Sequence, residues 1–482
     1  MERLAITWSL RGIEVMDWTM ALRMRIVEWT SGWTGLIVAA ALLLALLVTA
    51  LLRSSRWRDT HKRGARVVRR RGARQRFTTW TSAPAGDAVS LAGVPIEPLD
   101  ETKHFKLIGT TGTGKSTAIR ELLRRALERG DRAVITDPDG GYLLSFYHRY
   151  RGDVVLNPFE PEAVKWDPFA EVRDLYDVDQ LAGGLIPSTE DPSGREWRGY
   201  ARTFLTAVIR RCHERGPRDV AELWRLLAIA PSSELRPVVF DTPAQPFLEP
   251  ENARMFGSIR SVAGSAAAAL AYIKDQRAPP FSIRAWVQHG HGVLFIPYKA
   301  AQIAALRSII ATWMRLAIVE TMSCPDEDQR LWFVVDELDA LGAIDGLKDA
   351  LARLRKFGGR CVLGFQSIAQ VSSTYGAGEA QTLVENCGNT LILRCSGSEH
   401  GGTSQFASRL IGEREVIRRQ TSRGRDREGF WNNRAARRST NVSEQHVMES
   451  AVLPSELEQL PDLTGYLKTA SSPEWLRVAF SR

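Results

Sequence analysis

The sequence predicts an α/β fold with a mostly parallel central sheet, an inserted all-helical domain and an N-terminal transmembrane helix. Three observations support this prediction. A glycine-rich phosphate-binding motif stands between an apolar run and an amphipathic run at 105–129. Short apolar runs of strand length recur on both sides of a helical, arginine-rich region at 178–285. Eighteen uncharged residues at 35–52 precede all of these elements.

The overall composition is that of a globular protein with two or three domains. The chain has 482 residues, of which 44% are hydrophobic, so it can bury a sizeable core. Its five cysteines are scattered and include no C-x-x-C pair. This spacing argues against a zinc site or a disulfide framework and fits a reducing compartment.

The first organised element is the apolar segment 35–52, GLIVAAALLLALLVTALL. As a helix it would be about 27 Å long, close to the hydrocarbon thickness of a bilayer. A buried core helix would carry a polar face, and a signal peptide would have its positive charges before a shorter apolar run. We therefore expect a single transmembrane helix, preceded by an N-terminal segment at 1–34 that mixes aromatic and charged residues.

A basic linker at 53–90 follows the anchor. Residues 53–76 hold eleven Lys/Arg and one acid, a net +10, which leaves −1 for the rest of a chain whose total is +9. The positive-inside rule accounts for this cluster and predicts that everything after Arg53 is cytoplasmic. Contact with anionic lipid is a second role for the cluster, and direct DNA binding is a less favoured third.

The phosphate-binding motif occupies 109–117, GTTGTGKST, and matches G-x-x-x-x-G-K-[ST]. Phe105–Ile108 reads as a buried strand before it and 118–129 as an amphipathic helix after it. A strand, a glycine loop and a helix N-terminus together form an anion site, so the chain is expected to bind ATP. Lys115 would reach the β and γ oxygens, and Ser116 would ligate Mg²⁺. The residues expected to contact the nucleotide are Gly109, Thr110, Thr111, Gly112, Thr113, Gly114, Lys115, Ser116 and Thr117.

The next strand, 133–136, ends in an acidic turn, DPDGG at 137–141. Such a turn lies where α/β sheets place their ligands, although an ordinary Asp-Pro turn explains it equally well. A short strand at 154–156 follows. Between about 175 and 284 we expect helices at 197–213, 220–229 and 253–273, uninterrupted by strands. The nucleotide-binding domain is thus predicted at 91–177 and 286–482, with the all-helical domain at 178–285.

A Walker B strand is predicted at Leu331–Val335, followed by Asp336 and Glu337. A strand buried on both faces would deliver both carboxylates beside the phosphates. Asp336 would hold Mg²⁺ through water, and Glu337 would act as the general base toward the attacking water. This acidic pair predicts hydrolysis in addition to binding. The alternative is a strand followed by an acidic turn without a role in chemistry.

Strands at 292–297, 360–365 and 389–394 complete the expected sheet, and a buried helix is expected at 300–321. Gln366, at the end of the 360–365 strand, is a candidate sensor of the γ-phosphate. Arg394 is a candidate arginine finger for a neighbouring subunit's phosphate. Arg353 and Arg355 compete for that role, and a surface salt bridge is the alternative for any of the three.

Residues 414–438 are predicted to form a basic, strand-poor loop that contains Phe430 and Trp431. Arginines interleaved with aromatic residues suit single-stranded nucleic acid, since rings stack on bases and guanidinium groups meet phosphates. A solvated loop without a ligand is an equally good interpretation.

Across residues 90–475 the sequence resembles the TraD/TraG-type coupling ATPases of conjugative type IV secretion systems. The resemblance rests on an ordered series of short motifs. They are HFK at 104–106 leading into GTTGTGKS, DPDGG, LNPF at 156–159, WDPFAE at 166–171, DELDALG at 336–342, RKFGGR at 355–360, GFQSIAQ at 364–370, IGERE at 411–415, VLPSELEQLP at 452–461 and GYLK at 465–468.

This resemblance implies a RecA-like ATPase in the bacterial inner membrane that acts as a homo-hexamer. It implies that the protein receives a relaxase bound to single-stranded DNA and delivers it to the secretion channel. The all-helical domain would face the cytoplasm and the substrate, and Gln366 would be the family's motif glutamine. One departure concerns the membrane: the family usually has two spans, and only 35–52 is convincing here. Residues 1–34 are accordingly expected in the periplasm or at the membrane surface.

Two other functions remain open on the sequence alone. A translocase of the FtsK class shares the motor fold, but it carries several spans and a C-terminal winged-helix reader, for which we find no room after Tyr466. A receptor that docks protein effectors with little DNA pumping is the second alternative, which the near-neutral body of the chain favours.

Overall fold

The computed structural model describes residues 36–37, 40–45, 47, 60–69, 88–187, 192–216, 218–324, 329–399, 401–425 and 438–480. The chain divides into two compact units. The smaller unit combines Met1–Gly64 with Arg414–Glu449, and the larger combines Ala65–Glu413 with Ser450–Arg482.

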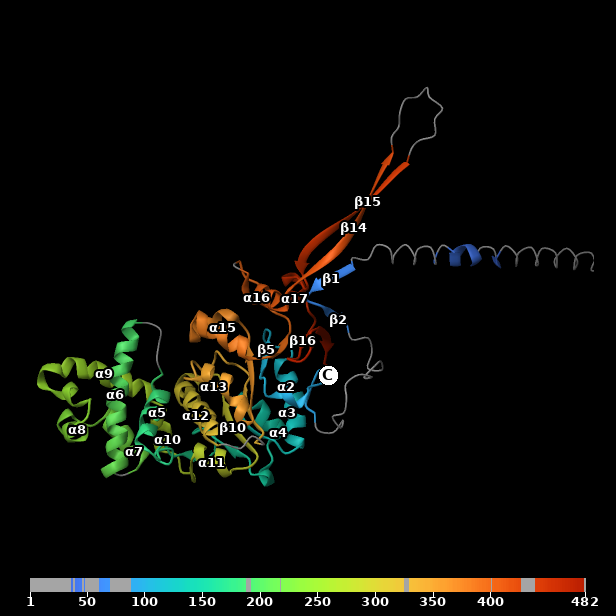
Figure 1. Ribbon diagram of the computed structural model, residues 1–482. Helices are drawn as coiled ribbons and strands as arrows, with labels where there is room; N and C mark the ends of the chain where they lie inside the picture. The colour runs from blue at the N-terminus through green and yellow to red at the C-terminus, as the bar shows by residue number, and fades with distance from the viewer. Residues whose placement is uncertain are drawn as a thin grey trace, which may run out of the picture. The chain divides into compact units, whose positions relative to one another are not determined.

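The larger unit is built on a ten-stranded sheet (Figure 1). Its strands in spatial order are β2 (Val67–Arg69), β17 (Trp475–Ala479), β16 (Thr464–Lys468), β13 (Asn389–Ile392), β5 (Phe105–Ile108), β12 (Gly359–Phe365), β11 (Leu331–Val335), β6 (Arg132–Pro138), β10 (Val293–Tyr298) and β7 (Val154–Val155). The seven strands from β13 to β7 are parallel, whereas β16 is antiparallel to both of its neighbours. The predicted mostly parallel sheet is confirmed.

The central strands are buried on both faces, which explains their continuous apolar sequences. Every residue of β11, LWFVV, is buried. Leu331, Phe333 and Val335 join one hydrophobic cluster, while Trp332 and Val334 join another. This is the alternation of a strand sandwiched between two helical layers.

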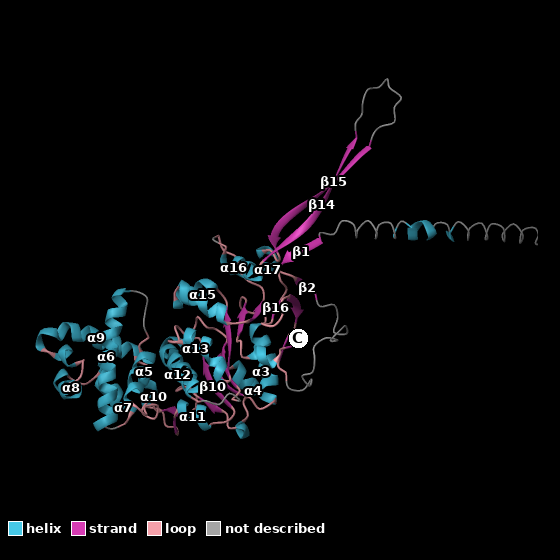
Figure 2. Ribbon diagram, viewed as in Figure 1, coloured by secondary structure: helices cyan, strands magenta, loops and turns pink. Residues whose placement is uncertain are grey.

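Helices cover both faces of the sheet (Figure 2). Side chains of α3 (Lys115–Glu128) and α4 (Gly141–Phe146) belong to the cluster that contains Trp332. Side chains of α12 (Ile303–Ser323), α13 (Leu347–Arg353) and α15 (Ala377–Asn386) belong to the cluster that contains Phe333. The remaining elements of this unit are α2 (Pro98–Glu101), α11 (Ile283–His289), α14 (Ile368–Tyr375), α16 (Gly402–Ile411), α17 (Pro454–Glu458), the hairpin β3 (Ser90–Leu91) and β4 (Val94–Pro95), and the 3₁₀ turns Arg149–Arg151 and Leu354–Phe357.

The inserted helices follow β8 (Lys165–Trp166) and gather at one end of this unit in Figure 1. They are α5 (Leu175–Leu185), α6 (Pro192–Arg215), α7 (Val220–Ala228), α8 (Ser232–Val239), α9 (Ala253–Ala266) and α10 (Leu270–Lys274), with 3₁₀ turns at Gln245–Leu248 and Pro250–Asn252. The expectation of an uninterrupted helical region is wrong in one detail. A two-residue strand, β9 (Pro280–Phe281), pairs in parallel with β8. Backbone hydrogen bonds thereby connect the segment after the inserted helices to the segment before them.

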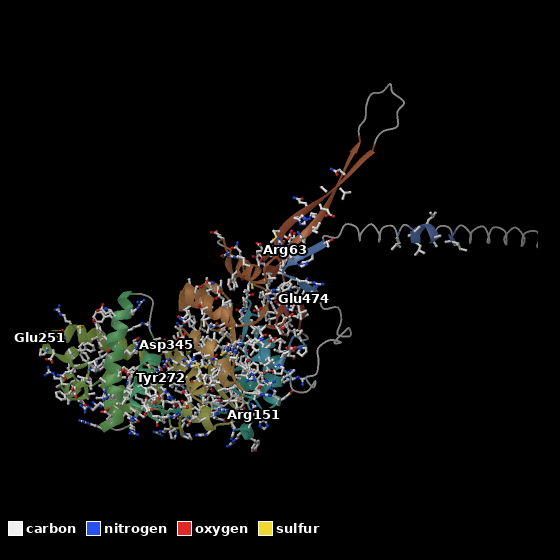
Figure 3. The ribbon with its side chains drawn as sticks, viewed as in Figure 1. Arg63, Arg151, Glu251, Tyr272, Asp345 and Glu474 are labelled. Atoms are coloured by element: carbon white, nitrogen blue, oxygen red, sulfur yellow. The ribbon has the colours of Figure 1, made fainter. Side chains whose placement is uncertain are left out.

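The smaller unit contains a three-stranded sheet of β1 (Thr60–Gly64), β14 (Glu413–Arg425) and β15 (Arg438–Ser450). The predicted strand-poor loop at 414–438 is therefore wrong over 414–425. Ion pairs between its strands stabilise this sheet: Glu415 pairs with Lys62 at 3.1 Å and with Arg63, and Arg414 pairs with Glu449 at 2.8 Å. Figure 3 labels Arg63, which belongs to β1. Phe430 and Trp431, at the predicted nucleic-acid contact, lie outside the described residues.

The predicted membrane anchor at 35–52 also lies largely outside the described residues. Those described within it, 36–37, 40–45 and 47, are helical and exposed. Among the described residues, no helix combines the length and the apolar character that a membrane crossing needs. Residues 53–90 contribute β1, β2 and the start of β3 to the two units.

Gly364 in β12 allows a close approach of two parallel strands. A Cβ at this position would lie 2.2 Å from the backbone oxygen of Asp336. We expect Gly364→Ala to lower the free energy of unfolding by about 1–3 kcal/mol, the cost of overpacking a core. Urea unfolding of the purified chain measures this change.

Gly257→Ala is the matched control, because Gly257 lies in α9 and a Cβ added there would meet no atom within 4 Å. We expect it to stabilise the protein by about 0.5–1 kcal/mol, the difference in helix propensity. Equal effects of the two substitutions would contradict the importance of the close approach at Gly364.

Candidate functional site

The phosphate-binding loop joins β5 to α3 at the carboxyl edge of the parallel sheet. β5 ends at Ile108, and α3 begins at Lys115 with Gly114 as its N-cap. Gly114 has φ = 115°, a conformation that L side chains rarely adopt, so glycine is required at this point. The helix N-terminus therefore faces the loop, as the sequence predicts for an anion site.

Lys115 is buried and lies against the inside of its own loop. Its Nζ donates to the carbonyl of Gly109 at 2.7 Å and to that of Thr110 at 3.3 Å. Burial lowers the pKa of this ammonium group. The loop thus holds a desolvated cation at its centre, where its electrostatic interaction with a phosphate is strongest.

The loop is fixed by backbone bonds to three other segments. Gly109 N–H donates to Phe365 O at 3.3 Å and Thr110 N–H to Arg394 O at 2.9 Å, which anchors the loop to the ends of β12 and β13. Leu463 N–H donates to Thr113 O at 2.9 Å. Gly109, Thr110 and Thr113 thereby serve as the framework of the loop.

Asp336 stands directly after β11, as predicted for a Walker B carboxylate. Its Oδ2 accepts hydrogen bonds from the Ser116 hydroxyl at 2.6 Å and from the Tyr142 hydroxyl at 2.8 Å. Its Oδ1 is buried and has no hydrogen-bond partner among the described residues. A buried carboxylate oxygen without a partner, next to a serine hydroxyl, fits the oxygen ligands that Mg²⁺ takes.

Glu337 is connected to the phosphate-binding loop through Gln366. Gln366 Nε2 donates to Glu337 Oε1 at 2.8 Å, and the Thr111 hydroxyl donates to Gln366 Oε1 at 2.8 Å. Burial, and then the charge of Asp336, raises the pKa of Glu337 above that of an ordinary glutamate. A carboxylate with a raised pKa is better matched to proton transfer near neutral pH.

These side chains surround one pocket of about 290 Å³. Nine predicted residues line it: Thr111, Gly112, Gly114, Lys115, Ser116, Thr117, Asp336, Glu337 and Gln366. Six further residues line it: Arg120, Pro138, Asp139, Gly141, Tyr142 and Leu463. The sequence did not name them individually as site residues, although it placed the turn at 137–141 where such sheets bind ligands. Four of the six belong to the DPDGG turn or directly follow it, so the acidic turn does lie at the ligand pocket.

Arg394 does not line the pocket in a single chain. Its guanidinium pairs with Asp462 at 2.7 Å, and the side chain is 36% exposed. Arg353 and Arg355 are exposed in α13 and the 3₁₀ turn after it. The assignment of an arginine finger to one of these residues stays a prediction, since that role concerns a neighbouring subunit.

The sequence around this pocket matches a known protein family. The family described as "Type IV secretion-system coupling protein DNA-binding domain" matches residues 88–481. The chain belongs to this coupling-protein family. The match spans the nucleotide pocket and the inserted helices, and it confirms the resemblance to TraD/TraG-type proteins.

Curated members of the family differ from this chain in length. The coupling protein TraD of Escherichia coli K12 is 31% identical over 393 residues, which cover 79% of this chain and 52% of TraD. VirD4 of Rhizobium rhizogenes is 23% identical over 360 residues, which cover 67% of this chain and 51% of VirD4. The chain thus spans about half the length of these curated relatives.

Solved structures of the coupling protein TrwB share the fold. The unbound form of TrwBdeltaN70 is 32% identical, with a TM-score of 0.76 over 88% of this chain and 94% of that one. TrwB in complex with ADP and Mg²⁺ is 31% identical with a TM-score of 0.75, over 88% and 94% of the two chains. These matches confirm the α/β, RecA-like architecture with a large, mostly parallel sheet.

Gly114→Ala should weaken nucleotide binding in the full chain. A Cβ here would lie 2.8 Å from Leu463 Cδ2, in a backbone conformation that costs about 1–2 kcal/mol for alanine. We expect at least tenfold weaker binding of Mg·ADP, because the loop and Leu463 must both shift. A fluorescent ADP analogue measures the affinity.

Gly130→Ala is the matched control, because it introduces a similar backbone strain at a glycine that does not line the pocket. Gly130 follows the other end of α3 with φ = 90°, and a Cβ there would meet no atom within 4 Å. It should lower stability by a similar amount and leave nucleotide affinity unchanged. A comparable loss of affinity in both variants would show that general destabilisation is responsible.

Proposed function

We propose that this chain is a membrane-anchored coupling ATPase of bacterial conjugation. It would bind Mg·ATP, hydrolyse it, and deliver relaxase-bound single-stranded DNA to a type IV secretion channel. The observation that carries this proposal is the convergence of Lys115, Ser116, Asp336 and Glu337, from two separate segments, on one pocket. The TrwB structures with ADP and Mg²⁺ and with a non-hydrolysable ATP analogue support the choice of ligand.

Different residues of the pocket would bind the phosphates and the Mg²⁺ ion. The loop N–H groups and Lys115 would hold the phosphates, and Thr117 lies beside them in the first turn of α3. Ser116 and Asp336 would hold Mg²⁺, which neutralises phosphate charge when bound. A nucleotide bound in this pocket would have Glu337 and Gln366, which also line it, available to its γ-phosphate.

Glu337 would act as the general base of hydrolysis. Its position directly after Asp336 and its raised pKa suit it to accept a proton from water. Gln366 fixes the orientation of this carboxylate and is itself held by Thr111. Gln366 connects the phosphate-binding loop to Glu337. Loss of the γ-phosphate would therefore change the hydrogen bonding of Gln366 at the end of β12, which is the basis of its proposed sensor role.

The proposed substrate and assembly are suggested by the family. The matched family is described as a DNA-binding domain, and the relatives are coupling and conjugal-transfer proteins. We propose a relaxase bound to single-stranded DNA as the cargo and a homo-hexamer as the active assembly. Arg394 would then be released from Asp462 to meet the phosphate of a neighbouring subunit.

The proposed location is the bacterial inner membrane. The uncharged segment 35–52 is long enough to span it, and the +10 cluster at 53–76 would hold the ATPase body in the cytoplasm. Residues 1–34 would lie in the periplasm or at the membrane surface.

The cargo is tested by ATPase assays on the detergent-solubilised full chain. We expect single-stranded DNA to stimulate hydrolysis and Lys115→Ala to abolish it, because the loop then lacks its buried cation. Stimulation by relaxase alone, with none by DNA, would instead favour the receptor for protein substrates.

Glu337→Gln separates binding from hydrolysis. The amide oxygen can still accept from Gln366, so the pocket keeps its shape while losing the base. We expect nucleotide affinity within about twofold of wild type and hydrolysis reduced about 10²- to 10⁴-fold, the usual contribution of a general base. Wild-type turnover in this variant would refute the assignment.

The pH dependence of hydrolysis reports on Gln366. Glu337 must be ionised to act as a base, so activity should fall as the pH drops through its raised pKa. The hydrogen bond from Gln366 favours the ionised form, and Gln366→Leu should therefore move the acid limb of the kcat profile to higher pH. Gln381→Leu, which removes a surface glutamine that pairs with Glu385, should leave the profile unchanged. A matching shift in both variants would contradict the proposed contact.

A further inference from the structure

We propose that Tyr142 is a positioning residue for the Mg²⁺ site: its hydroxyl holds Asp336 by Oδ2 and thereby leaves Oδ1 for the cation. The inference deepens the proposed function and rests on it. Neither the sequence motifs nor the family resemblance assigns a role to Tyr142.

The first argument is the hydrogen bonding of Asp336. The carboxylate is 3% exposed, and two hydroxyl groups, those of Ser116 and Tyr142, donate to the same oxygen. The other oxygen is buried without a partner among the described residues. A carboxylate with one oxygen saturated and one free is already oriented for a cation that approaches the free oxygen.

The second argument concerns what happens to Ser116. Ser116 is the hydroxyl of the phosphate-binding loop that is expected to ligate Mg²⁺. It would do so through an oxygen lone pair, and its hydrogen can still be donated to Asp336 Oδ2. In the described part of the chain, Tyr142 is the other side-chain donor to Asp336 Oδ2, and it is not itself an expected ligand of the cation. Its hydrogen bond therefore holds Asp336 from outside the expected set of Mg²⁺ ligands.

The acidic turn explains why Tyr142 can reach Asp336. The buried Asp137 carboxylate accepts from Tyr142 N–H at 3.0 Å and from Leu143 N–H at 2.6 Å, which fixes the first turn of α4. Asp139 adopts φ = 61° in the short turn between β6 and α4. Tyr142 is 1% exposed, and its hydroxyl donates to Asp336 Oδ2 at 2.8 Å.

Arg120 fixes the Tyr142 ring from α3. Its guanidinium carbon lies 5.3 Å from the ring centroid, a cation–π distance. Arg120 is one helical turn beyond Ser116 and lines the same pocket. The Tyr142 backbone is thus held by Asp137 and its ring lies under a cation, while its hydroxyl donates to Asp336.

Tyr142→Phe tests the proposal directly, because it keeps the ring and its packing and removes only the hydroxyl. The measurement is a Mg²⁺ titration of the detergent-solubilised full chain with bound fluorescent ADP, which involves no turnover. We expect the apparent Mg²⁺ affinity to fall about 10- to 100-fold, the usual effect of losing a partner of a metal ligand. ADP affinity in EDTA should stay within about twofold of wild type.

Tyr298→Phe is the matched control. Tyr298 is also a buried tyrosine, but its hydroxyl has no hydrogen-bond partner among the described residues. Its substitution should leave Mg²⁺ affinity unchanged. Arg120→Leu, which keeps the Tyr142 hydroxyl and loosens the ring, should give an intermediate loss and provides a second test if Tyr142→Phe folds poorly.

The outcomes separate this inference from the proposed function. Wild-type Mg²⁺ affinity in both Tyr142→Phe and Arg120→Leu would overturn the positioning role while leaving nucleotide binding intact. Failure of the wild-type chain to bind ADP with or without Mg²⁺ would overturn the proposed function itself. An equal loss in Tyr142→Phe and Tyr298→Phe would show that any buried hydroxyl matters, and would also overturn the role of Tyr142.

Discussion

Burial of negative charge at the carboxyl edge of the sheet is the constraint on which the site depends. Asp137 and Asp336 are almost fully buried, and Glu337 adjoins them. Burial raises the pKa of both Asp137 and Glu337, and the charge of Asp336 raises it further. Hydrogen bonds from hydroxyl and backbone N–H groups, together with the Lys115 ammonium, offset only part of the free-energy cost of burying these charges. A site of this kind favours an added divalent cation.

The order of the strands explains how Glu337 is connected to the phosphate-binding loop. β12 lies between β5, which leads into the loop, and β11, which leads to Asp336 and Glu337. Any polar residue at the end of β12 therefore stands between the two, and Gln366 occupies that position. Its amide donates on one side and accepts on the other, which a carboxylate could not do.

Much of this arrangement could be predicted from the sequence, because its signals are local. Phe105–Ile108 and Leu331–Val335 have the predicted bounds, since a continuous apolar run marks a strand buried on both faces. Tyr142, Arg120 and Leu463 could not be identified, because their roles come from contacts between distant segments. β14 could not be predicted for another reason: its arginine-rich sequence carries no apolar alternation, and ion pairs to other strands stabilise it.

The contact of Leu463 with the phosphate-binding loop has a consequence for the order of folding. Leu463 is 350 positions beyond Thr113, its φ is 59°, and its carbonyl accepts a hydrogen bond from Phe480 N–H. The strands β5, β6, β10, β11 and β12 can assemble on the ribosome as they emerge, since domains generally fold from the N-terminus during synthesis. The last wall of the pocket must wait until β16 and β17 have been translated. A nascent chain consequently exposes an incomplete loop, and nucleotide capture becomes a late event in the maturation of the protein.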